Sequence, residues 1–216
     1  MDDNHQNRTL AIVGGGGLGR ELESWLCKSN LINEYHLVGY LDDNKGSLIG
    51  YQNDFSVVDA INPESLKTYG NILIGVANCK FKEELFKAYK KYKNFNILSF
   101  IHSSVVLGKH LKIENGVIIS PNVVLSCNTS IKDGVFINIG SQIGHDVTID
   151  CYSSIMANVD IGGGAHIGKN VTIGTGAVIL PKVKIPDNVF IGAGSVVIRS
   201  FKKEGTYFGN PAKKIF

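Results

Sequence analysis

The sequence predicts a protein of two parts: an α/β N-terminal domain with a Rossmann-like β-α-β unit, followed by a parallel β-helix. From Ile101 to Val197 an aliphatic residue occupies every sixth position without interruption, a period typical of hexapeptide-repeat β-helices. Before that point, an aliphatic strand-like run meets a glycine-rich turn and then a helix-like segment, which indicates a β-α-β unit. We therefore place the two domains at residues 1–98 and 99–216.

The N-terminal domain begins with a strand that ends at a glycine-rich turn. The strand is expected at Leu10–Val13, and the turn, Gly14–Gly19, contains the spacing Gly-x-Gly-x-x-Gly that is known from dinucleotide-binding folds. Glycines let a ligand approach the backbone, and the N-terminus of the following helix offers N–H donors to an anion or a polar sugar. A plain tight turn is the alternative interpretation.

Further helices and strands complete this domain. In chain order we expect them at residues 20–30 (helix), 35–43 (strand), 71–78 (strand) and 82–92 (helix). The first helix would place Leu22, Trp25 and Leu26 on one face, and Asp42 falls close to where dinucleotide folds carry a ribose-binding acid. Because the domain is about half the size of a full dinucleotide-binding fold, we expect a ligand of mononucleotide size.

The period of six in the second domain predicts short strands joined by tight corners, because a helical period of 3.6 residues does not fit it. The aliphatic residue points inward, and so does the small or branched residue two positions earlier, as strand alternation demands. The residues just past the aliphatic one form the corner, where Gly or Asn adopts positive φ. Three such sides close a coil of eighteen residues, and stacked coils make a parallel β-helix.

The composition narrows the classes of partner. Hydrophobic residues make up 44% and charged residues 19% of the 216 residues, as in ordinary globular proteins, and a net charge of +3 is too small to indicate nucleic acid without a basic patch. No apolar run reaches the roughly 18 residues of a membrane helix, and Met1–Asn7 lacks a signal-peptide core. Cys27, Cys79, Cys127 and Cys151 form no C-x-x-C pair. We therefore expect reduced thiols in a cytoplasmic protein, with no membrane or metal partner.

One corner of the repeat carries reactive side chains: Gly144–Asp146 reads Gly-His-Asp where neighbouring corners read Gly-Lys-Asn or Gly-Thr-Gly. A histidine suits general-base chemistry near neutral pH, an adjacent carboxylate can fix its tautomer, and backbone N–H groups at a glycine-rich corner can hold an oxyanion. His102, His110 and His166 stand at other phases of the repeat, with no acid following. The alternative is an exposed corner histidine without a role.

The chain as a whole resembles a known family. The β-α-β domain with its glycine-rich turn and Leu-Asp-Asp motif, the hexapeptide helix with its Gly-His-Asp corner, and the C-terminal Gly-Asn-Pro-Ala-Lys-Lys-Ile are together similar to the bacterial nucleotide-sugar acetyltransferases. The resemblance runs from Leu10 to Ile215. It implies a left-handed β-helix, acetyl-CoA as donor, a UDP- or dTDP-linked amino-sugar as acceptor, acetylation of the C4 amine for surface glycan or glycoprotein synthesis, and a homotrimer with active sites between subunits.

The same resemblance implies roles for individual residues. His145 would be the general base and Asp146 its acidic helper. The nucleotide-sugar would be bound by Gly16, Gly17, Asp42, Asp43, Gly75, Asn78 and Asn138. The coenzyme would be contacted at Ser154, Gly163, Thr175 and Ala193. The amide of Gly163 would lie near the thioester carbonyl, and only main-chain contacts are implied at Thr175 and Ala193.

Two departures from the family pattern leave the identity of the sugar open. Ser154 stands where many relatives carry a second histidine, and Leu18 stands where relatives carry a histidine in the glycine-rich loop. The alternatives in function are a sugar O-acetyltransferase of the sialic acid type and a non-catalytic nucleotide-sugar-binding protein. A zinc enzyme of the hexapeptide class would need three converging histidines, and no other histidine shares the repeat phase of His145.

Overall fold

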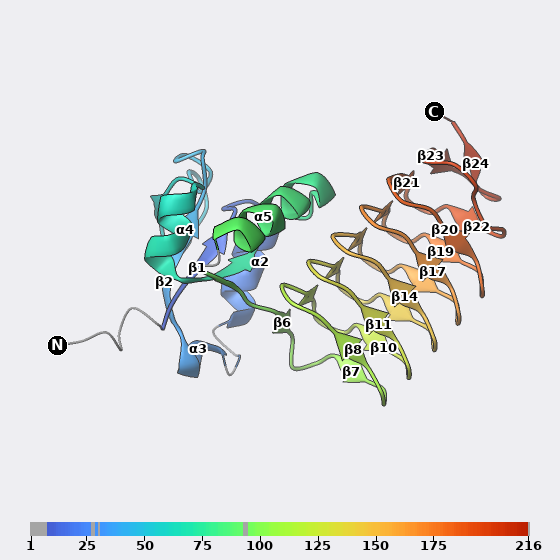
Figure 1. Ribbon diagram of the computed structural model, residues 1–216, viewed down its shortest axis with the longest axis horizontal. Helices are drawn as coiled ribbons and strands as arrows, with labels where there is room; N and C mark the ends of the chain where they lie inside the picture. The colour runs from blue at the N-terminus through green and yellow to red at the C-terminus, as the bar shows by residue number, and fades with distance from the viewer. Residues whose placement is uncertain (1–7, 27–28, 30, 93–94, 216) are drawn as a thin grey trace. The chain divides into compact units, whose positions relative to one another are not determined.

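The computed structural model of the protein describes residues 8–26, 29, 31–92 and 95–215 (Figure 1). Within them the chain forms two compact units. The first runs to Ala77 and resumes at Glu84–Leu98, and the second comprises Asn78–Glu83 and the chain from Ser99 onward. The sequence predicts a single division after residue 98, whereas the structure groups the six residues Asn78–Glu83 with the second unit.

The first unit is built on a parallel sheet with the strand order β3-β2-β1-β4-β5. Its strands are β1 (Thr9–Val13), β2 (His36–Leu41), β3 (Val57–Asp59), β4 (Asn71–Ile74) and β5 (Asn96–Ile97). The helices are α2 (Gly17–Leu26), α3 (Leu31–Glu34), α4 (Pro63–Tyr69) and α5 (Cys79–Tyr92), of which α5 begins in the second unit. The predicted strand–turn–helix–strand order is confirmed, and the central strand β1 is fully buried from Leu10 to Val13.

Several details of the first unit differ from the sequence-based expectation. The strand expected at residues 71–78 ends at Ile74, and α5 begins at Cys79 because Asn78 caps it by accepting a hydrogen bond from the Phe81 amide (3.0 Å). On α2, Glu23 is buried and bonds the Tyr40 hydroxyl, whereas Trp25 is only half-buried. A helical pattern based on apolar residues cannot predict a buried carboxylate that is satisfied by a distant tyrosine.

The second unit is a left-handed parallel β-helix, as predicted, with three sheets that we name after a central strand. The β13 sheet contains β7 (Val106–Leu107), β10 (Val124–Leu125), β13 (Gln142–Ile143), β16 (Asp160–Ile161), β19 (Val178–Ile179) and β22 (Val196–Val197). The β14 sheet contains β8 (Lys112–Ile113), β11 (Ser130–Ile131), β14 (Thr148–Ile149), β17 (His166–Ile167) and β20 (Lys184–Ile185).

The third sheet, the β15 sheet, continues beyond the repeats into the C-terminal segment. It contains β6 (Phe100–Ile101), β9 (Ile118–Ile119), β12 (Phe136–Ile137), β15 (Ser154–Ile155), β18 (Thr172–Ile173), β21 (Val189–Ile191), β23 (Gly205–Phe208) and β24 (Lys213–Lys214). Only the last pair, β23 with β24, is antiparallel. Figure 1 shows the coils stacked in chain order from β6 to β23.

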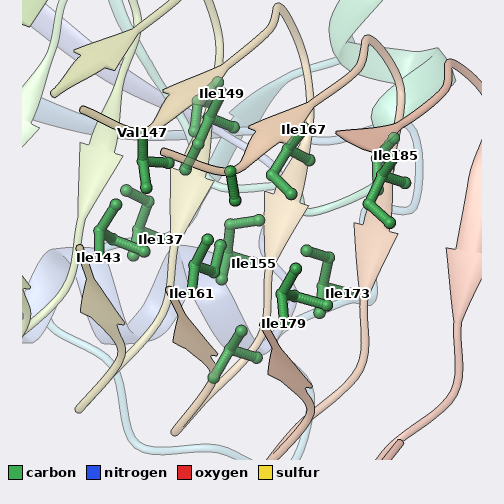
Figure 2. Packing of buried hydrophobic residues seen from close by; sticks show 14 of the residues in the cluster. Ile137, Ile143, Val147, Ile149, Ile155, Ile161, Ile167, Ile173, Ile179 and Ile185 are labelled. Atoms are coloured by element: carbon green, nitrogen blue, oxygen red, sulfur yellow. The ribbon is translucent and has the colours of Figure 1, made fainter. Parts of the chain in front are cut away.

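The core of the β-helix is formed by the repeating aliphatic residues. Ile137 pairs with Ile155, and Ile155 with Ile173, so each coil is eighteen residues long. Figure 2 shows these isoleucines stacked in columns inside the prism, and they are fully buried. Ser141 and Ser153 also point inward, where their hydroxyls donate to the backbone carbonyls of Met156 and Gly168 (2.9 and 2.7 Å), so that buried polar atoms are satisfied.

The first coil departs from the predicted burial. Leu107, expected to point into the core, is 49% exposed, and Ile101 and Ile113 are only partly buried. Each coil is covered on both sides by its neighbours except at an end of the stack, so the first coil has a partner on one side only.

The corners of the coils line up into three edges, each marked by positive φ. The histidine edge follows the β13 sheet and contains His110, Asn128, Asp146, Gly164 and Lys182. The glycine edge precedes the β13 sheet and contains Asn122, Gly140, Asn158, Gly176 and Gly194. The third edge, between the β14 and β15 sheets, contains Gly116, Gly134, Tyr152, Asn170 and Asn188. The corner prediction of Gly and Asn is confirmed at most of these positions.

Candidate active site

His145 and Asp146 form a hydrogen-bonded pair on the histidine edge. The Nδ1 atom of His145 lies 2.7 Å from Oδ2 of Asp146, and the two side chains remain 64% and 55% exposed. Asp146 adopts φ 60°, which turns its side chain outward at the corner. The hydrogen bond from His145, followed by one from Asn128, lowers the pKa of Asp146 below its ordinary value. The carboxylate therefore stays ionised near neutral pH and favours a proton on Nδ1.

The other ring nitrogen of His145 faces the next coil, where Gly163 occupies the equivalent corner position. A Cβ atom at position 163 would lie 2.5 Å from Nε2 and 2.7 Å from Cε1 of His145, which is shorter than any tolerated contact. Gly163 therefore has to be a glycine for the imidazole to keep this position. The sequence singled out Gly163 for its amide, and the structure adds this steric reason.

The corner amides of the β-helix fall into two groups. At some corners a side chain accepts from the N–H group, as Asn138 does from Ile139 (2.7 Å) and Asp187 from Lys169 (2.9 Å), and Gly163 belongs to the other group. Among the described residues, the Gly163 N–H has no hydrogen-bond acceptor. It is thus available to an oxygen atom of a ligand, beside the base.

The remaining coenzyme and sugar candidates of the β-helix lie on a different edge. Asn138, Thr175 and Ala193 belong to the corners of the glycine edge, and Thr175 and Ala193 are exposed. The β13 sheet separates this edge from the histidine edge in every coil. A single β-helix therefore does not bring these three residues to His145.

Ser154 does not join either edge. It lies in β15 and is fully buried, because the amine of Lys82 in the first turn of α5 covers it. The Lys82 Nζ atom is 2.7 Å from the Ser154 hydroxyl and 3.1 Å from the Ser153 carbonyl oxygen. Burial lowers the pKa of Lys82 to about 7. The position expected to contact the coenzyme is thus closed off by a lysine within the same unit.

In the first unit, the glycine-rich turn leaves open space at two of the predicted glycines. A Cβ atom at Gly16 or Gly17 would meet nothing within 4 Å, and both residues are exposed at the start of α2. Gly75 is instead buried beneath the turn, where a Cβ would lie 2.8 Å from the Gly19 Cα. Gly75 therefore permits the close packing of β4 against the turn, while Gly16 and Gly17 present backbone to a ligand.

The two acids after β2 hold the surrounding loops. Asp42 accepts hydrogen bonds from the amides of Gly15 (2.7 Å) and Asn44 (2.8 Å), one on each oxygen. Asp43 is exposed and accepts from the Ile61 amide (2.9 Å). Asp42 thus joins the glycine-rich turn to the end of β2, a role that sequence spacing alone did not reveal.

A second histidine–carboxylate pair was missed by the sequence analysis. His166, in β17, places Nε2 2.9 Å from Oδ2 of Asp150, which precedes it by sixteen residues. The sequence feature that could have revealed this pair is the separation of sixteen residues, which is close to the eighteen residues of one coil. No acid directly follows His166.

Three of the four cysteines, Cys79, Cys127 and Cys151, are free thiols, and Cys27 lies outside the described residues. Across the described ranges, His, Cys, Asp and Glu side chains form no group of three or more suited to a metal ion. None of the described helices has the length and apolar character of a membrane span.

Comparison with known families gives two matches along the chain. The model described as the PglD N-terminal domain matches residues 9–89. The model described as bacterial transferase hexapeptide (six repeats) matches residues 164–199. The first covers the β-α-β unit with its glycine-rich turn, and the second covers coils at the C-terminal end of the β-helix.

Individual proteins match over most of the chain. A GDP-perosamine N-acetyltransferase of Escherichia coli O157:H7 is 31% identical over 192 residues, which are 86% of this chain and 76% of that protein. The acetyltransferase domain of PglB from Neisseria gonorrhoeae FA1090 is 26% identical, with a TM-score of 0.84 over 97% of this chain and 100% of that one. A second structure of that domain, in complex with acetyl coenzyme A, is 25% identical, with a TM-score of 0.65 over the same shares.

Proposed function

Because the chain belongs to the family of bacterial nucleotide-sugar N-acetyltransferases, we propose that it transfers the acetyl group of acetyl-CoA to the C4 amine of a nucleotide-linked amino-deoxysugar. One observation in the structure supports this chemistry above others. The His145 imidazole is tethered through Nδ1 to Asp146, while Nε2 lies beside Gly163, whose amide is unoccupied within the described chain. A base and an oxyanion donor stand side by side, as acyl transfer requires.

In the proposed reaction, the sugar amine attacks the thioester carbonyl, and a C–N bond forms. Nε2 of His145 accepts a proton from the attacking nitrogen, and Asp146 stabilises the resulting imidazolium through Nδ1. The Gly163 amide donates to the oxyanion of the tetrahedral intermediate. When the C–S bond breaks, the imidazolium returns its proton to the coenzyme sulfur, so the products are an N-acetyl sugar and free CoA thiol.

We assign recognition of the nucleotide-sugar to the first unit. The exposed backbone at Gly16 and Gly17 stands at the N-terminus of the ten-residue helix α2, which suits phosphate or polar sugar groups. Asp42 and Asp43 border the same loop region through their bonds to Gly15 and Ile61. UDP or dTDP remains the predicted nucleotide, and the GDP-perosamine relative makes GDP a third to test. The predicted cytoplasmic location agrees with the use of acetyl-CoA.

We further propose a homotrimer with a shared active site. The outward positions of the β13 sheet carry Val106 (59% exposed), Val124 (37% exposed), Val178 and Val196 towards its two ends, with the exposed Gln142 and Asp160 on the two strands between them. The β14 sheet instead presents Lys112, Ser130, Thr148, His166 and Lys184. The valines at four of these six positions, on a face flanked by the two candidate edges, fit contact with a second copy. A heterologous contact that closes on itself gives cyclic symmetry and would bring the glycine edge of one subunit to the histidine edge of another.

A thiol-release assay tests the reaction. Acetyl-CoA is combined with a panel of UDP-, dTDP- and GDP-linked 4-amino-sugars, with the 4-hydroxy counterparts and with sialic acid as matched acceptors. The proposal expects release of CoA only with an amino-sugar. Turnover with hydroxyl acceptors alone would favour the O-acetyltransferase alternative, and no turnover with any acceptor, despite calorimetric binding of a nucleotide-sugar, would favour a binding protein.

Light scattering and subunit mixing test the shared site. We expect the mass of a trimer, and we expect a mixture of His145→Ala and Ala193→Trp chains to regain part of the activity that each variant lacks alone. Regain requires one intact site formed from two different chains. A fully active monomer, or mixed trimers without any regained activity, would contradict the proposal.

A further inference from the structure

Asn128 contacts the candidate catalytic pair from the preceding coil of the histidine edge. Its Nδ2 atom lies 3.2 Å from Oδ1 of Asp146, while Oδ2 of the same carboxylate is bonded by His145 Nδ1. The two oxygens of Asp146 therefore have separate partners, and the three side chains form a continuous chain of hydrogen bonds. Asn128 precedes Asp146 by eighteen residues, one full coil.

The backbone on both sides fixes this arrangement. Asn128 and Asp146 both adopt the left-handed conformation, with φ of 57° and 60°, so their side chains leave successive coils in the same way. The Asp146 amide donates to the Cys127 carbonyl (3.0 Å), which holds the two corners in register. On the opposite side the next corner residue is Gly164, which has no side chain that could compete for the carboxylate.

We propose that Asn128 is a positioning residue for the base: it holds the Asp146 carboxylate so that Oδ2 faces His145 and keeps the proton on Nδ1. This inference rests on the proposed function, because it concerns the same pair. The Asp146 side chain is 55% exposed, so without a second partner it rotates freely and bonds water. Anchoring Oδ1 removes this freedom, leaving Nε2 in the proton-accepting tautomer beside Gly163.

Few other titratable groups lie on the edge that carries His145 and Asp146, so the effect of Asn128 on this pair can be measured. The other titratable groups on the same edge are His110 and Lys182 at the corner positions, Lys109 next to His110, and Cys127 next to Asn128. The lowered pKa of Asp146 has the hydrogen bond from His145 as its largest cause and the one from Asn128 as the next.

Two substitutions at this position separate positioning from folding. Asn128→Asp keeps the shape and tolerates positive φ, but it replaces the donor by a second carboxylate. Asn128→Gly keeps the backbone conformation and removes the side chain. Asn188, at φ 56° on the third edge, supplies the matched controls Asn188→Asp and Asn188→Gly.

We expect both Asn128 variants to lower kcat by about 3- to 10-fold, the scale of one net hydrogen bond, with little change in the KM for acetyl-CoA. In Asn128→Asp the added charge favours imidazolium, so the acidic limb of the kcat/KM profile should move up by about half a pH unit. The ¹⁵N shifts of His145 in the free protein should show loss of the pure Nδ1–H tautomer in both variants. The Asn188 controls should match the wild type.

The outcomes distinguish this inference from the proposed function. If His145→Ala is inactive while both Asn128 variants keep the wild-type kcat, pH profile and ¹⁵N shifts, the positioning role is refuted and the base assignment stands. If His145→Ala itself retains activity, the proposed mechanism fails, and the ¹⁵N shifts alone still decide whether Asn128 sets the tautomer. Equal losses in the Asn128 and Asn188 variants would also overturn the positioning role, since they would indicate a general effect on the corners.

Discussion

The β-helix carries two histidine–aspartate pairs with similar nitrogen–oxygen distances, one at a corner of the coils and one with its histidine on a flat sheet. His145 and Asp146 are sequence neighbours on an edge, joined through Nδ1 at 2.7 Å. His166 and Asp150 lie sixteen residues apart, with the histidine on the flat β14 sheet, and are joined through Nε2 at 2.9 Å. Both pairs are partly exposed, with histidine side chains that are 64% and 46% accessible.

The difference lies in which ring nitrogen is left for a ligand. His145 holds its acid with the nitrogen nearest its own backbone and keeps the outer Nε2 beside the free amide of Gly163. His166 uses the outer nitrogen for Asp150, which leaves only the nitrogen near its own backbone. A histidine–carboxylate contact by itself therefore does not indicate a catalytic base; the free nitrogen and its surroundings do.

The strongest test of this contrast is the same substitution at both histidines. We expect His145→Asn to lower kcat by roughly 10²- to 10⁴-fold, the usual contribution of a positioned base, and His166→Asn to leave kcat within about 2-fold. Both variants should remain folded, because neither side chain is in the core. Thiol release at pH 7 measures the effect, and comparable losses at the two positions would remove the distinction drawn above.

A smaller effect is expected when the imidazole is displaced rather than removed. In Gly163→Ala the new methyl group occupies the space of the His145 ring, and a displacement of about 1 Å at a reacting group can cost on the order of 10²-fold in rate. In a His145→Ala background the same change should have little further effect, because the clash is absent. Additive losses in the double variant would show that Gly163 acts independently of the histidine.

In contrast to these exposed histidines, the buried Lys82 should make the free energy of unfolding depend on pH. Lys82 has a pKa of about 7 in the folded protein, because burial disfavours its charge, whereas the unfolded chain binds the proton up to the ordinary value of 10.5. Above pH 7 the unfolded state therefore holds more protons, and stability should rise with pH between about 7 and 10 by at most about 1.4 kcal/mol per pH unit. Below pH 7 this contribution to the pH dependence ends.

Denaturant unfolding at pH 7 and pH 9.5 measures this slope. Lys82→Met should flatten it and should increase stability at pH 7, while the exposed neighbour substitution Lys80→Met should preserve the wild-type slope. An unchanged slope in Lys82→Met would mean that Lys82 remains protonated in the fold.

The smallest effect is expected from the second pair. His166→Gln should change the free energy of unfolding by less than about 1 kcal/mol, because exposed ion pairs contribute little. The loss should diminish in high salt, since screening weakens what attraction exists. Thermal unfolding at two salt concentrations measures it, and a large, salt-independent loss would show that this pair has a structural role that its exposure does not suggest.

The β-helix was predictable in detail because every coil obeys the same local rule. Each aliphatic residue from Ile119 to Ile191 fills the same kind of inward position, so the period fixes strands, corners and coil length without knowledge of distant contacts. The first unit was predictable only in outline. Its β3 and α4 lack a strong apolar period, and α4 depends on a capping box between Asn62 and Ser65 at its start.

By itself, the sequence determined the fold class, the family resemblance and the Gly-His-Asp corner, because these depend on residues close together in the chain or on a strict period. Only the tertiary structure decided what meets across coils: Asn128 with Asp146, Gly163 with the His145 ring, Asp150 with His166, and Lys82 over Ser154. Those contacts join residues sixteen to seventy-two positions apart. Their geometry follows from the stacking of coils and from the place of Lys82 within the second unit, which no local pattern records.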